Sequence, residues 1–222
     1  MMVRVFDILF SALGIISTLP LTLPVMLILK LTGEGEIFYL QPRVGRYRRP
    51  FRVLKFATML KESPNMEGGY LTRRKDPRIL PFGRLLRASK INELPQLVNV
   101  LLGDMSFVGP RPQALVHFNL YSTDKQRIIQ TVRPGLTGVG SLIFRNEEAM
   151  LPRSERDADA VHDHVITPYK GDVEWWFVEN KTTLLYFKTI FLTVIGMLFP
   201  RMRMRRFFPN LPEPPEQISE LI

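Results

Sequence analysis

The densest group of side chains that could do chemistry lies between residues 87 and 112. Asn92 and Glu93 come just before a short apolar segment, and Asp104 and Arg111 follow it. The start of a helix presents free N–H groups and the positive end of its dipole, which stabilise a phosphate. Arg111 stands between two prolines that stiffen its backbone, and a guanidinium held in this way suits bidentate phosphate binding. The pattern indicates either a phosphate site or a capped helix followed by a surface arginine.

The element that must position these side chains is a helix predicted over residues 93–102. Between Leu94 and Leu102, apolar residues recur at i, i+3, i+4, i+7 and i+8, as they do on one face of a helix. Asn92 occupies the N-cap position, Pro95 is tolerated in a first turn, and Gly103 suits the end. Polar groups are therefore expected at both ends of one amphipathic helix.

Three other cations could contact a phosphate. Lys55 ends a strand-like run, and Arg78 and Arg87 flank a helix predicted at residues 80–86. Each could neutralise phosphate charge. For each, an ordinary structural or solvated role stays open.

The charge of the whole chain narrows the class of partner. Its 222 residues include 30 Lys and Arg against 21 Asp and Glu, a net charge of +9. Such a chain attracts nucleic acid, anionic lipid or phosphorylated substrates. Because no helix-turn-helix, RNA-binding signature or zinc spacing is present, we predict no nucleic-acid partner. The basic turn at residues 42–50 could attract anionic lipid headgroups instead. The absence of cysteine excludes a disulfide scaffold, a cysteine-ligated zinc site and thiol catalysis.

A second cluster, His162-Asp163-His164, resembles a metal-binding sequence at first sight. On a helix, residues i and i+2 point to different faces, and the sequence implies no further ligand. The pattern therefore favours solvated side chains over a metal site.

The N-terminal segment is long and apolar. From Ile8 to Leu29, 22 residues carry no charge, enough to cross roughly 30 Å of hydrocarbon. Pro20 and Pro24 each remove a helix N–H donor, so a kink is expected, and Ser17 and Thr18 could satisfy the freed backbone groups. The residues alone leave two interpretations open. The segment crosses the bilayer, which its length favours, or it bends near Pro20 and returns to the same face.

The remaining sequence predicts a mixed α/β fold. Strands are expected at residues 36–40 and 51–56, and helices at 113–122, 123–132 and 154–165. Residues 182–199 are apolar and precede a basic stretch. This pattern is typical of an amphipathic helix at a membrane interface, with Trp175 and Trp176 as anchors, and a buried C-terminal helix with a solvated basic tail stays open. The proline-rich end at 212–216 is predicted to be disordered.

A series of short motifs also occurs in an order that is typical of one protein family. In chain order these are Gln41-Pro42-Arg43-Val44-Gly45, Lys55-Phe56-Ala57-Thr58-Met59, Asp76-Pro77-Arg78, Gly83-Arg84-Leu85-Leu86-Arg87, Glu93-Leu94-Pro95-Gln96, Asn99-Val100-Leu101, Gly103-Asp104-Met105-Ser106, Val108-Gly109-Pro110-Arg111-Pro112 and Arg133-Pro134-Gly135-Leu136-Thr137-Gly138. Together they resemble the bacterial sugar transferases, the monotopic phosphoglycosyl transferases that start capsule, exopolysaccharide, O-antigen and glycoprotein glycan assembly. The resemblance covers the chain to about residue 199.

This resemblance implies a reaction and a set of partners. A sugar phosphate passes from a nucleotide diphosphate sugar, usually a UDP-sugar, to a polyprenyl phosphate such as undecaprenyl phosphate, and UMP is released. In the family an Asp-Glu dyad works with Mg²⁺, and the Asp holds the phosphosugar covalently. Spacing and resemblance together assign catalysis to Asn92 and Glu93, phosphate or nucleotide binding to Lys55, Arg78, Arg87 and Arg111, and Mg²⁺ binding to Glu93 and Asp104.

The resemblance also implies a place in the cell. The family's N-terminal helix is re-entrant and breaks at a proline ten residues before a lysine, a spacing that Pro20 and Lys30 reproduce. We therefore expect a re-entrant hairpin at residues 1–30, a catalytic domain at 31–200 and a basic, then Pro- and Glu-rich tail at 201–222. The domain is expected on the cytoplasmic face of the bacterial inner membrane. Neither the sugar nor the oligomeric state follows from the sequence, and a homo-oligomer stays open.

One departure from the family pattern bears on activity, since Asn92 stands where the dyad has Asp. An amide does not act as a nucleophile toward phosphorus and is a weaker metal ligand than a carboxylate. Four explanations stay open: an engineered block, Glu93 as nucleophile, direct attack by the lipid phosphate, or an inactive protein that binds UDP-sugar or polyprenyl phosphate. The sequence favours a working transferase. The rivals are that inactive binding protein and a transmembrane-anchored scaffold.

Overall fold

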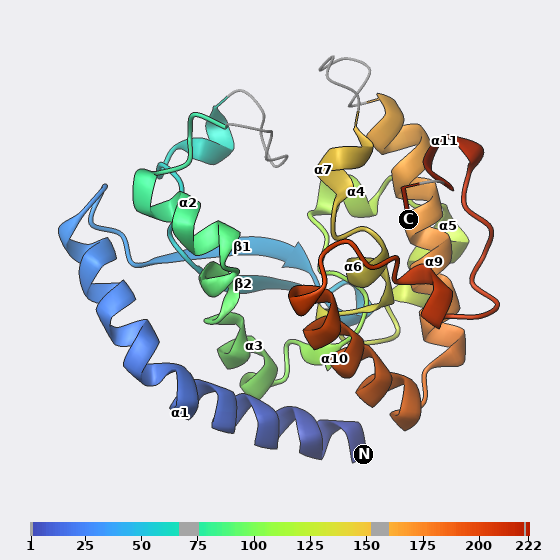
Figure 1. Cartoon of the computed structure of the whole chain (residues 1–222), viewed down its shortest axis with the longest axis horizontal. Helices are drawn as coiled ribbons and strands as arrows, with labels where there is room; N and C mark the ends of the chain where they lie inside the picture. The colour runs from blue at the N-terminus through green and yellow to red at the C-terminus, as the bar shows by residue number, and fades with distance from the viewer. Residues whose placement is uncertain (1, 67–75, 152–159, 220) are drawn as a thin grey trace. The chain divides into compact units, whose positions relative to one another are not determined.

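The computed structural model describes residues 2–66, 76–151, 160–219 and 221–222 (Figure 1). The chain forms two compact units. The first, termed the α1 unit, comprises Arg4–Arg43 and Phe51–Gly103. The second, termed the α9 unit, comprises Met1–Val3, Val44–Pro50 and Asp104–Ile222. The described residues form helices and two small sheets, which confirms the predicted mixture of α and β structure.

The α1 unit starts with one long helix and continues with a hairpin and two short helices. Its elements are α1 (Met2–Leu31), β1 (Phe38–Val44), β2 (Pro50–Phe56), α2 (Pro81–Ala88) and α3 (Gln96–Leu102), with 3-10 turns at Ser63–Asn65 and Ile91–Glu93. Strands β1 and β2 pair with each other. The hairpin and α2 confirm the strands and the helix that the sequence predicts in this region.

An apolar cluster joins α1, β2 and α2 of the α1 unit. Val25 and Leu29 of α1 pack with Phe56 of β2 and Leu86 of α2, all four at 5% exposure or less. Helix α2 comes close to the strand end because Gly83 has no side chain. A Cβ at this position would lie 2.2 Å from the carbonyl oxygen of Thr58.

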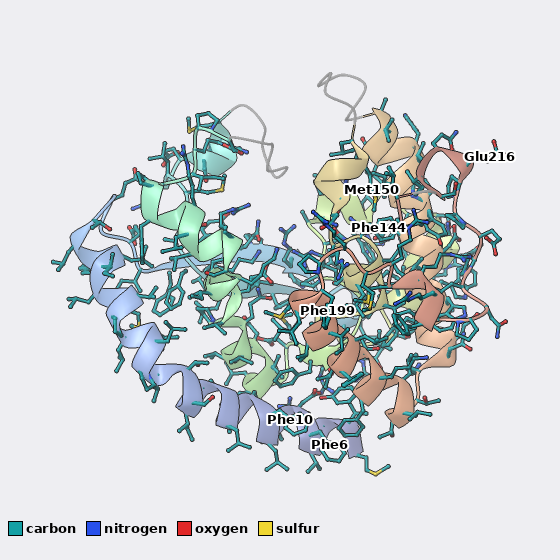
Figure 2. All side chains as sticks on the ribbon, in the orientation of Figure 1. Phe6, Phe10, Phe144, Met150, Phe199 and Glu216 are labelled. Carbon is teal, nitrogen blue, oxygen red and sulfur yellow. The ribbon has the colours of Figure 1, made fainter. Side chains whose placement is uncertain are left out.

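Helix α1 runs through both prolines without interruption, although its axis turns along its length (Figure 1). The hydroxyls of Ser17 and Thr18 donate to the carbonyl oxygen of Gly14, at 3.2 and 2.6 Å. Pro20 has no N–H to donate to the carbonyl oxygen four residues earlier, which belongs to Ile16. The two hydroxyls bond to Gly14 instead, so the expectation that they satisfy the carbonyl left without a donor by Pro20 is wrong. Nearer the N-terminus of the helix, Phe6 and Phe10 stack with ring centroids 5.8 Å apart (Figure 2).

The start of α3 differs from the prediction. Asn92 lies inside the 3-10 turn Ile91–Glu93, and α3 begins only at Gln96, with no side chain bonded at its N-cap. Pro95 has no N–H for an i→i−4 bond, so the chain makes i→i−3 bonds here, among them Leu94 N to Ile91 O at 3.1 Å. The N-cap role predicted for Asn92 is therefore wrong, and its side chain does not cap α3.

The α9 unit is mostly helical around a second, parallel pair of short strands. Its elements are β3 (Ser106–Val108), α4 (Leu115–Phe118), α5 (Thr123–Ile129), β4 (Gly135–Thr137), α6 (Val139–Ile143), α7 (Glu147–Met150), the π-helical turn His162–Ile166, α9 (Thr167–Asn180), α10 (Thr183–Leu198) and α11 (Glu216–Ser219), with 3-10 turns at Arg46–Arg48 and Arg205–Phe207. Helix α9 packs against α5 and α6, and α6 also contacts α10. The helix predicted at 123–132 is confirmed as α5.

Two predictions for this unit need correction, and a third falls partly outside the described residues. The strands predicted from sequence do not include β3 and β4, which form a parallel pair with Ser106 opposite Gly135. Strands of three residues are too short to show an alternating pattern. The helix predicted at 113–122 shortens to α4, because the carbonyl oxygen of Gln113 accepts from Val44 N at 3.0 Å. Of the helix predicted at 154–165, only residues 160–165 are described, and they are helical.

The C-terminal tail is packed, so the prediction of disorder at 212–216 is wrong. Leu211 and Ile218, on either side of the prolines, are buried. The Tyr169 hydroxyl donates to the carbonyl oxygen of Pro212 at 2.9 Å, and Arg205 forms an ion pair with Glu213 at 3.0 Å. The proline and glutamate content of this segment is typical of disorder. A few buried apolar residues are nevertheless enough to anchor so short a segment, and composition does not reveal them.

Candidate functional site

Asn92 and Glu93 lie in the 3-10 turn that joins α2 to α3. The turn follows Lys90, whose φ of 60° places it in the left-handed region. Asn92 is only 6% exposed, and its Oδ1 has no hydrogen-bond partner among the described residues. Glu93, beside it, is half-buried. A buried carbonyl oxygen with no partner is costly, so this position suits an oxygen that binds a ligand or ion.

Lys55 is held in β2 at the edge of the same apolar cluster. Its Nζ donates to Oε1 of Gln41 in β1 at 3.0 Å. The next residue, Phe56, packs in the cluster that also contacts Ile91, the neighbour of Asn92. The structure thus anchors Lys55 and the 91–93 turn to one core.

Asn99 is a positioning residue that chemistry-based reading of the sequence missed. Its Oδ1 accepts from Leu54 N and its Nδ2 donates to Arg52 O, both at 2.9 Å. The side-chain amide thereby pairs with the backbone of β2 as a neighbouring strand would, and it ties α3 to the strand that carries Lys55. The sequence signal that could have revealed this role is an Asn on the buried face of an otherwise apolar helix, because a buried amide needs hydrogen-bond partners.

Asn99→Ala is expected to lower the free energy of unfolding by about 2 kcal/mol, because two part-buried backbone groups lose their partners. Chemical denaturation of the detergent-solubilised chain measures this. Asn65→Ala is the matched control, since Asn65 is exposed and bonds only to Glu62 among the hydrogen bonds resolved. Equal stability of the two variants would contradict the role of Asn99 as a clamp.

The two arginines near α2 differ in position. Arg78 is 3% exposed and binds Asp76 through Nε and Nη2, at 2.9 and 2.6 Å, and Ser63 O through Nη1 at 3.0 Å. The hydrogen bond that Arg78 donates to Asp76 raises the pKa of this guanidinium. Its place favours a structural role, and the phosphate role of Arg78 stays a prediction. Arg87 is half-buried in the last turn of α2.

In the α9 unit, Arg111 lies on a segment that the backbone holds tightly. Pro110 O accepts from Gly135 N at 2.8 Å, and Gly109 N donates to Thr137 O at 3.0 Å. Gly109 and Gly135 approach so closely that a Cβ on Gly135 would lie 2.2 Å from Gly109 N. The Arg111 side chain itself is exposed. Backbone bonds thus fix the segment while the guanidinium stays accessible, as the flanking prolines predict.

Glu174 of α9 completes the support of this segment, and no sequence motif pointed to it. Its Oε1 accepts from Arg111 N at 3.2 Å, while its Oε2 is buried with no hydrogen-bond partner among the described residues. Burial raises the pKa of Glu174 to about 7, although the Arg111 N–H and the Lys170 ammonium oppose the rise. The carboxyl lines a pocket within this unit with Val44, Gly45, Pro110, Arg111, Gln113, Phe118, Tyr121, Ile129, Gln130, Val132 and Pro134.

Glu174 should make stability depend on pH. Because its folded pKa exceeds the ordinary value of 4.5, its contribution is fully present below about pH 4.5 and is lost as pH rises through 7. From about pH 5 to 8.5, the wild-type chain is expected to lose roughly 2–3 kcal/mol relative to Glu174→Gln. Denaturation curves across this range measure the difference. Glu179→Gln, which changes an exposed residue of the same helix, should keep the wild-type slope, and parallel curves for all three proteins would refute the prediction.

The predicted site residues fall into two groups. Lys55, Arg78, Arg87, Asn92 and Glu93 belong to the α1 unit. Asp104, which is exposed, and Arg111 belong to the α9 unit.

Apolar surface is concentrated on two helices. Within the described residues, α1 is the one helix long and apolar enough to cross a membrane, and only 11% of its most apolar window is buried. Leu13, Ile16 and Leu23 are more than half exposed. In the α9 unit, helix α10 exposes Leu184, Phe191 and Met197 in a similar way.

Comparison with known proteins gives consistent matches. The model of the bacterial sugar transferase family matches residues 1–200. The exopolysaccharide production protein ExoY of Sinorhizobium fredii is 36% identical over 174 residues, which cover 72% of this chain and 76% of that protein. The undecaprenyl-phosphate glucose phosphotransferase of Komagataeibacter xylinus is 32% identical over 206 residues, 89% of this chain and 36% of that protein. The UDP-glucose:undecaprenyl-phosphate glucose-1-phosphate transferase of Caulobacter vibrioides is 41% identical over 143 residues, 63% of this chain and 52% of that protein.

Proposed function

The chain belongs to the bacterial sugar transferase family, and we propose that it transfers a sugar-1-phosphate from a UDP-sugar to undecaprenyl phosphate. A phosphate oxygen of the lipid forms a bond to the β-phosphorus. The bond from that phosphorus to the bridging oxygen breaks, and UMP leaves with the oxygen and its electron pair. Similarity to relatives named as undecaprenyl-phosphate sugar transferases carries this proposal. The product is the first lipid-linked intermediate of a polysaccharide.

Within this proposal, Glu93 is the acidic group at the reacting phosphorus. The Asn92 amide offers a carbonyl oxygen and no nucleophilic carboxylate. Two routes are chemically competent: Glu93 attacks first and the lipid phosphate displaces it, or the lipid phosphate attacks directly while the protein holds both phosphates in line. Lys55 and Arg87 of the α1 unit neutralise phosphate charge in either route.

The donor set beside Asn92 fits Mg²⁺. The buried Asn92 Oδ1 has no hydrogen-bond partner among the described residues, and Glu93 adds a carboxylate, so both offer the oxygen ligands that Mg²⁺ prefers. Glu93 and Asn92 of the α1 unit would hold the ion. When bound, Mg²⁺ neutralises charge on the diphosphate.

Release of UMP from UDP-sugars in the presence of undecaprenyl phosphate and Mg²⁺ tests the proposal. A second candidate rests on Asn92 itself, because an amide at this position also suits an inactive protein that binds UDP-sugar or polyprenyl phosphate. Such a protein would bind UDP-sugar or polyprenyl phosphate and release no UMP.

We also propose that α1 is re-entrant and keeps the chain on the cytoplasmic face of the inner membrane. Near its N-terminal end, Arg4 donates to Val100 O and Leu101 O at 2.5 and 2.7 Å. Near its C-terminal end, Val25 and Leu29 pack in the core of the same unit. A helix that crosses the bilayer once would carry its two ends to opposite sides, so these contacts support the re-entrant form.

Single cysteines at Met2 and Glu34 test the topology, since the chain has no cysteine of its own. In intact spheroplasts, a membrane-impermeant maleimide is expected to label neither position. In inside-out vesicles it is expected to label both, as it should a reference cysteine at the exposed Asn180. Labelling of position 2 alone from outside would show a spanning helix.

A further inference from the structure

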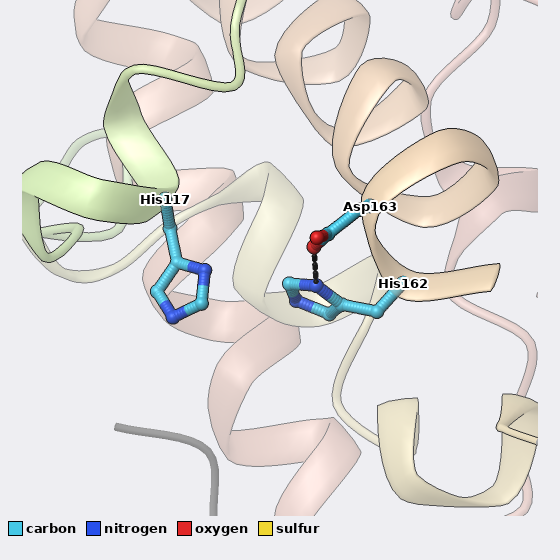
Figure 3. Close-up of side chains that lie close together, drawn as sticks. All are labelled: His117, His162 and Asp163. Atoms are coloured by element: carbon cyan, nitrogen blue, oxygen red, sulfur yellow. Dashed lines mark hydrogen bonds and ion pairs between the residues drawn. The ribbon is translucent and has the colours of Figure 1, made fainter. Parts of the chain in front are cut away.

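A group of metal-binding side chains lies outside the residues assigned to transfer. His117 of α4 and His162 and Asp163 of the π-helical turn come together in the α9 unit (Figure 3). One ligand atom from each residue lies within 4.8 Å of the other two. Helical spacing alone argues against a metal site at His162 and Asp163, because His164 lies on a different face of the helix from His162. The fold supplies the missing ligand from a residue 45 positions earlier.

The orientation of His162 resembles that of a metal ligand. Its Nδ1 forms a hydrogen bond of 2.7 Å with Asp163 Oδ1 (Figure 3), which a bound ion would replace, and its Nε2 lies 3.6 Å from Glu147 Oε1. Lys170 binds both oxygens of Glu147 at 2.7 Å, which holds this carboxylate in place. Metal-bound imidazoles commonly direct their second nitrogen toward a carboxylate.

Burial leaves the cluster open on one side. The His162 side chain is 7% exposed, whereas that of Asp163 is 40% exposed. The ring of His117 meets the ring of His162 edge to face, with centroids 5.3 Å apart. Two nitrogens and one oxygen therefore converge, and solvent can reach a fourth position. The π-turn that carries two of the ligands is itself a rare element, and such turns are frequent at functional sites.

We propose that His117, His162 and Asp163 bind one Zn²⁺ ion, with solvent as the fourth ligand. A set of two imidazoles and one carboxylate suits a borderline ion such as Zn²⁺ rather than Mg²⁺, which prefers oxygen. Zn–N bonds of roughly 2.0–2.1 Å require the side chains to rotate inward by a small amount. The ion joins α4 to the start of α9. Because α4 closely follows the Arg111 segment, the site stabilises that segment.

The test uses the full-length chain in detergent, stripped of metal with a chelator. Calorimetric titration with Zn²⁺ is expected to give one site per chain with a Kd of about 1 μM, and Zn²⁺ should raise the melting temperature. Absorption of the Co²⁺-loaded chain should report a four-coordinate ion. Mg²⁺ at the same concentration should produce none of these signals at this site.

Variants separate the site from adventitious binding. His117→Ala and Asp163→Asn, which change half-buried residues, should each weaken Zn²⁺ binding more than about 100-fold, since changes in outer-shell groups alone cost roughly 10–100-fold. His164→Ala is the matched control: His164 is exposed, and this variant should bind within about twofold of wild type. The absence of a Zn²⁺ site in wild type, or an equal loss in His164→Ala, would overturn the proposal. Neither outcome depends on transferase activity.

Discussion

Glu93→Gln is expected to reduce Mg²⁺-dependent UMP release by roughly 10³-fold or more. Glu93 is the carboxylate next to Asn92, so in either chemical route it carries the charge that Asn92 lacks. Loss of a nucleophile or of an acid–base group typically costs this much or more. The change is nearly isosteric, so the half-buried turn should keep its shape. Initial rates of UMP release at saturating UDP-sugar and undecaprenyl phosphate measure the effect.

Glu179→Gln is the matched control for Glu93→Gln. It makes the same chemical change at an exposed position of α9 and should leave the rate within about twofold, as a surface substitution does. If Glu93→Gln retained a rate similar to that of the control, Glu93 could have no role at the reacting phosphorus.

Asn92→Asp is expected to raise UMP release by roughly 100-fold and to create a covalent intermediate. The substitution adds a carboxylate nucleophile at a buried position whose Oδ1 has no hydrogen-bond partner among the described residues. With UDP-sugar present and the lipid phosphate omitted, the variant should gain the mass of a phosphosugar. The unaltered chain should gain this mass only if Glu93 attacks directly, so intact-mass spectrometry also separates the two routes.

Asn65→Asp controls for the added charge. Asn65 lies at an exposed position of the same unit, and this variant should show neither the adduct nor the faster release. An Asn92→Asp variant that folds, binds UDP-sugar and still gains neither property would show that position 92 does not face the reacting phosphorus.

The local elements that position the site were largely predictable from sequence. The hairpin that carries Lys55 follows from alternating residues and a basic turn, and α3 follows from its apolar spacing. The predicted start of α3 is too early, because the apolar spacing of residues 93–102 does not reflect that Pro95 lacks a backbone N–H. That single hydrogen-bond deficit moves Asn92 from an N-cap into a buried turn.

The contacts between segments distant in the sequence could not be predicted. Asn99 pairs with β2 across 45 residues or more, and Glu174 meets Arg111 across 63. Local periodicity does not indicate which backbone group a buried polar side chain will contact. For the same reason, helical spacing around His162 and Asp163 could not predict that His117 lies beside them.

The measurement that tests the central claim most directly is UMP release by the unaltered chain. A panel of UDP-sugars is offered with Mg²⁺, with undecaprenyl phosphate present or omitted. We predict sustained UMP release with at least one UDP-sugar, dependent on the lipid phosphate and lost in Glu93→Gln. The assignment as a sugar-phosphate transferase would be contradicted if neither the unaltered chain nor Asn92→Asp released UMP with any UDP-sugar of the panel while UDP-sugar binding stayed intact.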